Sequence, residues 1–206
     1  DAARRKWDAQ LISSDAAAKI APINGRGSKR GLALRAIRQT AQQRRDMRGG
    51  RLDIGIIGMG HVGPVIGSAL RAVGHTIVGV SASSEESRER ADALLPGIPI
   101  LTVEEIVSRC QMVVLTVPDD QLEGLVKGLA ELGAWQPSQL VVHTSGAHGI
   151  DILRPASGMG AIPLAIHPAM TFTGTSVDVP RLVGTPFAVT APAIALPIAQ
   201  ALVVEM

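Results

Sequence analysis

Two segments of the sequence place imidazoles and hydroxyls directly after apolar runs. The first is His143-Thr144-Ser145-Gly146-Ala147-His148 and the second is Ile166-His167-Pro168-Ala169-Met170-Thr171. A histidine can exchange protons near neutral pH, and a serine hydroxyl can hydrogen-bond a substrate oxygen. These residue types suit a reaction in which a proton moves to or from a small substrate. We therefore take His167 as the candidate acid/base, with His143 and Ser145 assisting it.

Each of these side chains also has a structural interpretation. A histidine at the end of a strand can be held in the core, and the Ser145 hydroxyl can cap the turn that follows it. The single cysteine, Cys110, excludes an internal disulfide and fits a small buried hydrophobe between a helix and a strand. One cysteine and scattered histidines lack the spacing of metal ligands, so no metal site is predicted.

A glycine-rich segment follows the apolar run Leu52–Ile57. Within it, Gly58 permits a tight turn, Gly60 lets the backbone approach a pyrophosphate, and Gly63 allows close packing of helix on strand. The helix that follows offers free N–H groups and a partial positive charge to phosphates. The segment therefore predicts a dinucleotide site with these contacts: Gly58, Met59, Gly60, His61, Val62 and Gly63.

The second strand of such a unit usually ends in an acid that binds the ribose 2′-hydroxyl of NAD. Here the segment is Val80-Ser81-Ala82-Ser83-Ser84, with no acid, and Arg88 or Arg90 nearby could accommodate a 2′-phosphate. NADP is therefore favoured, while Glu85 and Glu86 keep NAD as the alternative. Three hydroxyls are predicted to face the adenosine ribose: Ser81, Ser83 and Ser84.

Another strand end, Thr116-Val117-Pro118-Asp119-Asp120, belongs to the same expected site. Ligands of open α/β sheets lie beyond the carboxyl ends of the strands. Val117 and Pro118 are therefore expected along the cofactor. For Asp119 we expect a capping role at the start of the next helix.

Short apolar runs alternate with amphipathic stretches from residue 51 onward. The predicted strands are Leu52–Ile57, Thr76–Ser81, Ile98–Leu101, Met112–Val117, Leu140–His143, Ala161–Ile166 and the later run Phe187–Thr190. The predicted helices are His61–Val73, Ser84–Leu94, Val103–Arg109, Asp120–Leu132 and Ile194–Glu205. This alternation predicts an α/β fold with a doubly wound, Rossmann-type sheet.

Composition and charge divide the chain into three regions. Residues 1–50 hold 12 Lys and Arg against 4 Asp, a net charge of +8, whereas residues 51–206 hold 8 against 14 acidic residues, a net charge of −6. We interpret residues 1–50 as a basic, disordered leader; a nucleic-acid arm, a membrane-surface arm or a transit peptide are the alternatives. Residues 51–190 are the predicted dinucleotide-binding domain, and residues 191–206 the first helix of a truncated C-terminal helical domain.

Four motifs together resemble a known family. They are Gly58–Gly63, Val117–Asp120, His143–His148 and the run from Ile166 to Thr175. Between Leu52 and Met206 the chain resembles an actinobacterial family of oxidoreductases that have an N-terminal Rossmann-like domain and a C-terminal helical domain of unknown function. More distantly it is similar to the superfamily of 6-phosphogluconate dehydrogenase, pyrroline-carboxylate reductase, ketopantoate reductase and prephenate dehydrogenase.

This resemblance implies roles for two residues. Prephenate dehydrogenases carry a His-Pro motif whose histidine serves the chemistry, and a serine after the preceding strand, which match His167 and Ser145. The hydroxyacid dehydrogenases of the superfamily use a Lys and an Asn from the helical domain. Here Lys127 is the only Lys after residue 50, and Asn24 is the only Asn, so that mechanism is not carried over.

The sequence thus predicts an oxidoreductase that transfers hydride between a nicotinamide cofactor, NADP favoured, and a small carbonyl, imine or hydroxy-acid substrate. The alternative is a nucleotide-binding sensor without turnover. We expect a cytoplasmic protein, no membrane or nucleic-acid partner, and a homodimer formed through the missing helical domain. Nucleic-acid binding through the basic leader is a third hypothesis, and it would depend on salt and on the leader.

Overall fold

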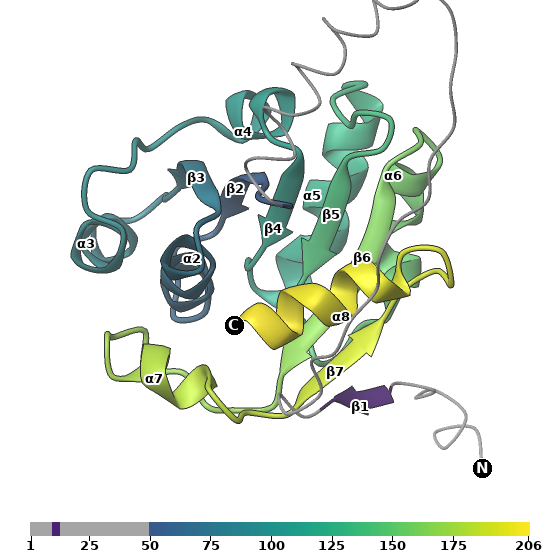
Figure 1. The fold of residues 1–206 in the computed structure, drawn as a ribbon. Helices are drawn as coiled ribbons and strands as arrows, with labels where there is room; N and C mark the ends of the chain where they lie inside the picture. Colours follow the sequence, from purple (N-terminus) through teal and green to yellow (C-terminus); the bar gives the residue numbers. More distant parts are fainter. Residues whose placement is uncertain (1–9, 13–49) are drawn as a thin grey trace, which may run out of the picture. The chain divides into compact units, whose positions relative to one another are not determined.

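The computed structural model describes residues 10–12 and 50–206. Within these residues one mixed sheet has the order β1-β7-β6-β5-β4-β2-β3 (Figure 1). The strands are β1 (Gln10–Ile12), β2 (Asp53–Ile57), β3 (Thr76–Ser81), β4 (Met112–Leu115), β5 (Leu140–His143), β6 (Ile162–Pro168) and β7 (Phe187–Thr190). The helices are α2 (Gly63–Ala72), α3 (Glu85–Leu94), α4 (Val103–Arg109), α5 (Asp119–Glu131), η2 (Ile150–Leu153), α6 (Arg154–Ser157), α7 (Asp178–Leu182) and α8 (Leu196–Glu205).

The strand order confirms the predicted doubly wound α/β fold. Strands β3, β2, β4, β5 and β6 are parallel neighbours, and the chain reverses its direction across the sheet between β2 and β4. β7 then pairs antiparallel with β6. In sheets of this kind the ligand crevice lies at the carboxyl ends of the strands, where the order reverses.

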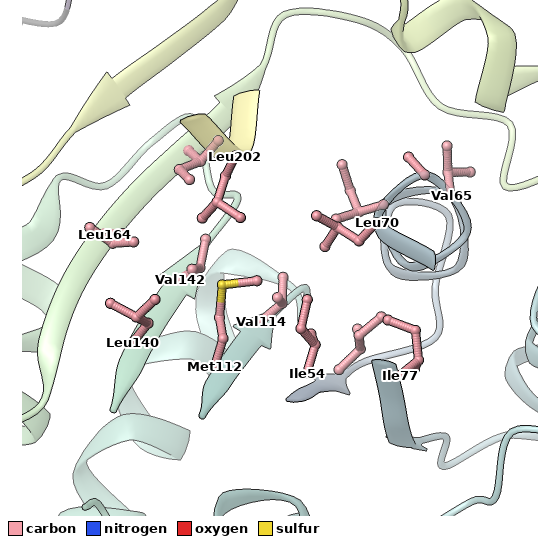
Figure 2. Close-up of a cluster of buried hydrophobic side chains, with 14 of the residues drawn as sticks. Ile54, Val65, Leu70, Ile77, Met112, Val114, Leu140, Val142, Leu164 and Leu202 are labelled. Atoms are coloured by element: carbon pink, nitrogen blue, oxygen red, sulfur yellow. The ribbon is translucent and has the colours of Figure 1, made fainter. Parts of the chain in front are cut away.

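Helices cover both faces of the sheet because the strand residues alternate between two apolar clusters. One cluster joins strand residues such as Ile54, Val114 and Val142 to α2 and α8, and Figure 2 shows Leu70 and Leu202 above these strands. The other cluster joins the opposite faces of β4 and β5 to α4, α5 and α6. With aromatics at only 2% of the sequence, aliphatic side chains form most of both clusters. Strands buried on both faces are typical of parallel sheets.

One predicted strand is wrong. The segment Ile98–Leu101 forms only an isolated bridge, between Val80 and Ile100, beside β3. Pro99 lacks the N–H that a longer ladder would need, although its carbonyl accepts a hydrogen bond from the Val80 N–H at 3.0 Å. The edge of the sheet beside β3 is consequently short.

Two other boundaries differ from prediction in ways that affect the site. β6 continues two residues beyond Ile166, so His167 lies within the strand and pairs with Ala188 of β7. The antiparallel β7 supplies the partner that prolongs β6. Asp119 is the first residue of α5 and not its cap: the N-cap is Pro118, and no side chain caps this helix. The capping prediction for Asp119 is therefore wrong.

The structure can be compared with the predicted leader and with the predicted C-terminal helix. Apart from β1, which pairs antiparallel with β7, and Gly50, the predicted leader lies outside the described residues. Helix α8 packs on the same sheet, because Ala199, Leu202 and Val203 are buried in the cluster shared with α2. Its assignment to a further helical domain stays a prediction. None of the helices in the described part of the chain is long and apolar enough to cross a membrane.

Candidate nucleotide-binding and catalytic site

Two glycines of the turn are required by the packing of the protein itself. Gly58 has φ +102°, and a Cβ there would lie 2.9 Å from the backbone carbonyl of Thr116. A Cβ on Gly63 would overlap the Gly58 carbonyl oxygen and lie 2.6 Å from Thr116 Oγ1. The Thr116 hydroxyl donates a hydrogen bond to that carbonyl at 2.6 Å, which ties the turn to the end of β4. These positions accept only glycine without rearrangement.

Gly60 differs, because a Cβ there would have no atom within 4 Å. It faces a cleft of about 790 Å³, a volume typical of small-molecule sites. Helix α2 begins at Gly63 with no side chain capping its first N–H groups and no acid in its first turn. A bare backbone and an uncapped helix N-terminus fit the pyrophosphate of a dinucleotide.

Five of the six predicted contacts of the turn line this cleft, and Gly63 does not; the five present different groups. Met59 lines the cleft, although it is only 1% exposed and belongs to the core cluster. His61 is exposed and Val62 is half-buried. The complete lining is Ile57, Gly58, Met59, Gly60, His61, Val62, Ser81, Ser83, Ser84, Ser87, Arg90, Val103, Thr116, Val117, Pro118, Gln121 and Leu125.

The end of β3 places hydroxyls and one cation in the cleft. Ser81, Ser83 and Ser84 all line it; that they face an adenosine ribose stays a prediction. The Ser84 hydroxyl also has a structural role, since it accepts a hydrogen bond from the Ser87 N–H at 3.2 Å and so caps α3. This second role follows from its position before an acidic first turn.

The structure distinguishes between the two arginines that the sequence left open. Arg90 lines the cleft, and no carboxylate of the described residues forms an ion pair with it. Arg88 is exposed, lies 3.7 Å from Glu85, and does not line the cleft. Neither Glu85 nor Glu86 is a lining residue. The electrostatic balance at this end of the cleft therefore favours an anion.

His143 lies inside the protein and outside the cleft. Its side chain is fully buried, and Nε2 donates to the Gly149 carbonyl at 3.1 Å. Because a carbonyl can only accept, Nε2 carries the proton, and the buried Nδ1 has no partner among the described residues. Burial lowers the pKa of His143 to about 4, against the opposing effect of the Gly149 hydrogen bond and assisted by the nearby His148 and His167. His143 is therefore neutral at pH 7.

His167 is held in one tautomer by the neighbouring strand. Nδ1 donates to the Thr144 carbonyl at 2.9 Å, so the neutral ring has its lone pair on Nε2. Gly146 packs against the ring: a Cβ on it would lie 2.8 Å from both Cε1 and Nε2. Nε2 makes no hydrogen bond to the described residues, and the side chain is only half-buried. The geometry leaves this nitrogen available to a ligand.

Ser145 adopts the turn-capping role that was the structural alternative. Its Oγ accepts the Ala147 N–H at 3.1 Å, which leaves the hydroxyl proton free to be donated elsewhere. Ser145 follows β5, and His167 lies near the end of the adjacent strand β6, because these strands pair with His143 opposite Ala165. The sheet thus brings the candidate hydroxyl and imidazole to the same edge.

The distance between the histidines and the cleft follows from the pairing of strands β4, β5 and β6. β4 pairs with β5 through Leu115 and His143, and β5 in turn pairs with β6. Strands are spaced about 4.8 Å apart, so β6 lies roughly 10 Å from β4, whose end lines the cleft. His167, His143 and Ser145 are not lining residues themselves. The cleft and the imidazoles therefore lie side by side along one edge.

Sequence reasoning missed several residues around the cleft. Thr116 was expected only as part of a strand end, and its hydrogen bond to Gly58 could not be read from spacing. Gln121 and Leu125 line the cleft from α5, one helical turn apart. Asp178, the first residue of α7, was not considered, although its carboxylate is fully buried. In the described residues no group of three or more His, Cys, Asp or Glu could hold a metal ion.

The fold is a doubly wound α/β domain with a glycine turn after its first parallel strand, β2. Residues 38–168 match the family model described as "Rossmann-like domain", which is more than half of the chain. The chain therefore belongs to the Rossmann-like domain family. No curated protein matches the sequence significantly.

Solved structures share this fold at low sequence identity. A 3-hydroxyisobutyrate dehydrogenase from Mycobacterium tuberculosis has a TM-score of 0.57 and 18% identity, covering 76% of this chain and 52% of its own. A prephenate dehydrogenase from A. aeolicus has a TM-score of 0.58 and 17% identity, covering 74% and 56%. An imine reductase from Streptomyces aurantiacus has a TM-score of 0.55 and 20% identity, covering 74% and 52%. The chain spans between half and three fifths of the length of these proteins.

Proposed function

We propose that this protein is an NADP-dependent oxidoreductase that transfers hydride between the nicotinamide and a small carbonyl, imine or hydroxy-acid substrate. The observation that carries the proposal is the cleft at the glycine turn. Gly60 is open to it, the end of β3 contributes hydroxyls without an acid, and Arg90 lines it. The solved structures of similar fold include dehydrogenases and an imine reductase, and one of them is a complex with NAD⁺.

The residues present fit such a cofactor along the whole cleft. The backbone of Gly58–Gly63 and the N-terminus of α2 would hold the pyrophosphate, Ser81 and Ser83 the adenosine ribose, and Arg90 a 2′-phosphate. Val117 and Pro118 would line the path toward the nicotinamide. When bound, the nicotinamide would supply or accept the hydride.

The protein's own part in the chemistry is to move a proton. With Nδ1 fixed on the Thr144 carbonyl, His167 would use Nε2 to take a proton from a substrate hydroxyl, or to give one to a carbonyl or imine. Ser145, on the adjacent strand end, would donate its free hydroxyl proton to a substrate oxygen. His143, buried and neutral, would support the loop through Gly149 and not exchange protons itself.

The proposed cofactor preference is tested by two arginine variants on the same helix. Arg90→Ala should weaken NADPH binding about tenfold or more and leave NADH binding nearly unchanged, because only NADPH has a 2′-phosphate. Arg88→Ala is the matched control, since this exposed arginine pairs with Glu85 outside the cleft. Equal effects of the two substitutions would contradict the proposal.

An assay of turnover distinguishes an oxidoreductase from a nucleotide-binding sensor. The protein is incubated with NADPH and a panel of small ketones, aldehydes and imines, and cofactor oxidation is followed by absorbance. An oxidoreductase oxidises NADPH with at least one of them, and the product carries the transferred hydride. Tight NADPH binding without oxidation by any member of a broad panel would favour the sensor.

A further inference from the structure

The segment between β6 and α7 is organised around one buried carboxylate. Asp178 has no exposed surface, and its Oδ2 accepts three hydrogen bonds. They come from the Thr173 N–H at 2.6 Å, the Thr173 hydroxyl at 2.9 Å and the Gly174 N–H at 2.8 Å. A carboxylate removed from water needs such compensation. Asp178 therefore fixes the backbone at residues 173 and 174.

An ion pair holds the other oxygen of the same carboxylate. Arg181 donates to Oδ1 at 2.8 Å and also to the Thr171 carbonyl at 3.3 Å. Burial alone would raise the pKa of Asp178, but its hydrogen bonds with Thr173, Gly174 and Arg181 hold that pKa below the usual value. The carboxylate is thus ionised at neutral pH, and it ties the start of α7 to the segment before it.

This fixed segment packs against two residues of the nucleotide cleft. Gly174 has φ +77°, and a Cβ there would lie 3.0 Å from His61 Cα, 2.9 Å from His61 Cδ2 and 3.3 Å from Arg90 Cδ. Figure 1 shows α7 and its preceding loop beside α2, away from the strand that they follow. No side chain at residue 174 could allow so close an approach. The backbone of Gly174 thus forms a wall behind the stem of Arg90.

We propose that Asp178 is a positioning residue for cofactor selectivity, holding Gly174 against Arg90 so that the guanidinium stays at the 2′-phosphate end of the cleft. The inference rests on the proposed NADP function. An Arg side chain has many rotamers and loses conformational entropy when it binds a ligand. Contact with a rigid backbone restricts these rotamers before binding, so less entropy is lost on binding. Preorganisation of this kind acts on Arg90 without any contact between Asp178 and the cofactor.

A double-mutant cycle on the full chain tests the coupling. The ratio of the NADH and NADPH dissociation constants is measured for the wild type, Asp178→Ala, Arg90→Ala and the double variant. Asp178→Ala should lower the selectivity about threefold or more when Arg90 is present, and should not lower it further in the Arg90→Ala background. Gly174→Ala keeps the carboxylate, but its methyl would press on His61 and on Arg90, so it should lower the ratio in the same direction.

A control variant distinguishes an effect on the position of Arg90 from a general loss of protein stability. Leu202→Ala removes packing in α8, away from the cleft, and should lower the melting temperature without changing the ratio. If folded Asp178→Ala and Gly174→Ala both keep the wild-type ratio while Arg90→Ala loses it, the inference is overturned and the proposed function stands. If the wild type itself shows no NADPH preference, the proposed cofactor fails, and the inference fails with it.

Discussion

The two halves of the sheet's carboxyl edge differ in what their polar groups are doing. At the ends of β2 and β3, Gly60 faces open space and Arg90 has no carboxylate partner among the described residues. At the ends of β5 and β6, by contrast, His143 and His167 each donate one ring N–H to a backbone carbonyl. The first half has groups free to bind a ligand; the second has committed part of its polar groups to the protein.

Residue type alone therefore points to function in the first half but not in the second. A glycine facing a cleft has no structural role that explains it, whereas a histidine at a strand end can be explained by packing alone. His143 is such a case, since it is fully buried with a pKa lowered to about 4. His167 keeps one ring nitrogen free, so both interpretations apply to it at once.

The largest effects are expected for substitutions of Gly60 and Gly63, and they should differ in kind. Gly60→Val should reduce NADPH affinity about 100-fold or more with little change in melting temperature, because the new side chain enters the cleft and its Cβ has no protein atom within 4 Å. Gly63→Ala should instead lower the free energy of unfolding by about 1–3 kcal/mol, because its methyl meets the Gly58 carbonyl and Thr116. Thermal melts and fluorescence titrations of both variants measure this, and a destabilised Gly60→Val would contradict the comparison.

The next effect concerns His167 as a proton carrier. In an active preparation with a substrate found by screening, His167→Asn should lower the maximal rate by at least about tenfold, within the range of general acid/base catalysis. Cofactor affinity and melting temperature should stay nearly unchanged. If turnover survives while the melting temperature falls, His167 is structural, like His143.

Stability should depend on pH through His143. The folded state keeps this ring neutral until about pH 4, whereas the unfolded chain binds the proton near pH 6.5. Stability is therefore complete above pH 6.5 and is lost as the pH falls toward 4, by roughly 3 kcal/mol. His143→Gln, which keeps a donor for Gly149, should flatten the dependence of the unfolding free energy on pH in this window. An unchanged slope in that variant would assign the dependence to other groups.

The smallest effect is expected for the leader. Deleting residues 1–46 should leave NADPH affinity unchanged, because every residue that lines the cleft lies between Ile57 and Leu125. The melting temperature should fall by only about 2–5 °C, since β7 loses the pairing of three residues with β1. A loss of cofactor binding would show that the leader belongs to the site.

Much of the nucleotide half could be predicted from the sequence because its signals are local. The turn Gly58–Gly63 and the strand Thr76–Ser81 depend on residues adjacent in the chain, and β3 begins and ends at the predicted residues. The same holds for α4, whose capping box joins Thr102 to Glu105. Local chemistry of this kind is readable without knowledge of the tertiary fold.

The features that could not be predicted depend mostly on contacts between residues far apart in the chain. The bond from His167 to Thr144 spans 23 residues, and the approach of Gly174 to His61 crosses more than a hundred. Pairing with β7 prolongs β6 past Ile166, and Pro99 reduces an expected strand to a bridge. Asp178 is different, because its partners Thr173, Gly174 and Arg181 lie within five residues of it. They belong to a loop and a short helix without a repeating pattern, so spacing alone does not predict these bonds.

Binding of NADP in the cleft at the glycine turn is tested by titrating the wild-type protein with NADPH and with NADH. Nicotinamide fluorescence is followed at low and at moderate salt. We predict saturable binding of both, tighter for NADPH by about tenfold, with the difference shrinking as salt screens the pairing of Arg90 with the 2′-phosphate. No saturable binding, or equal affinity for the two cofactors at low salt, would contradict the account.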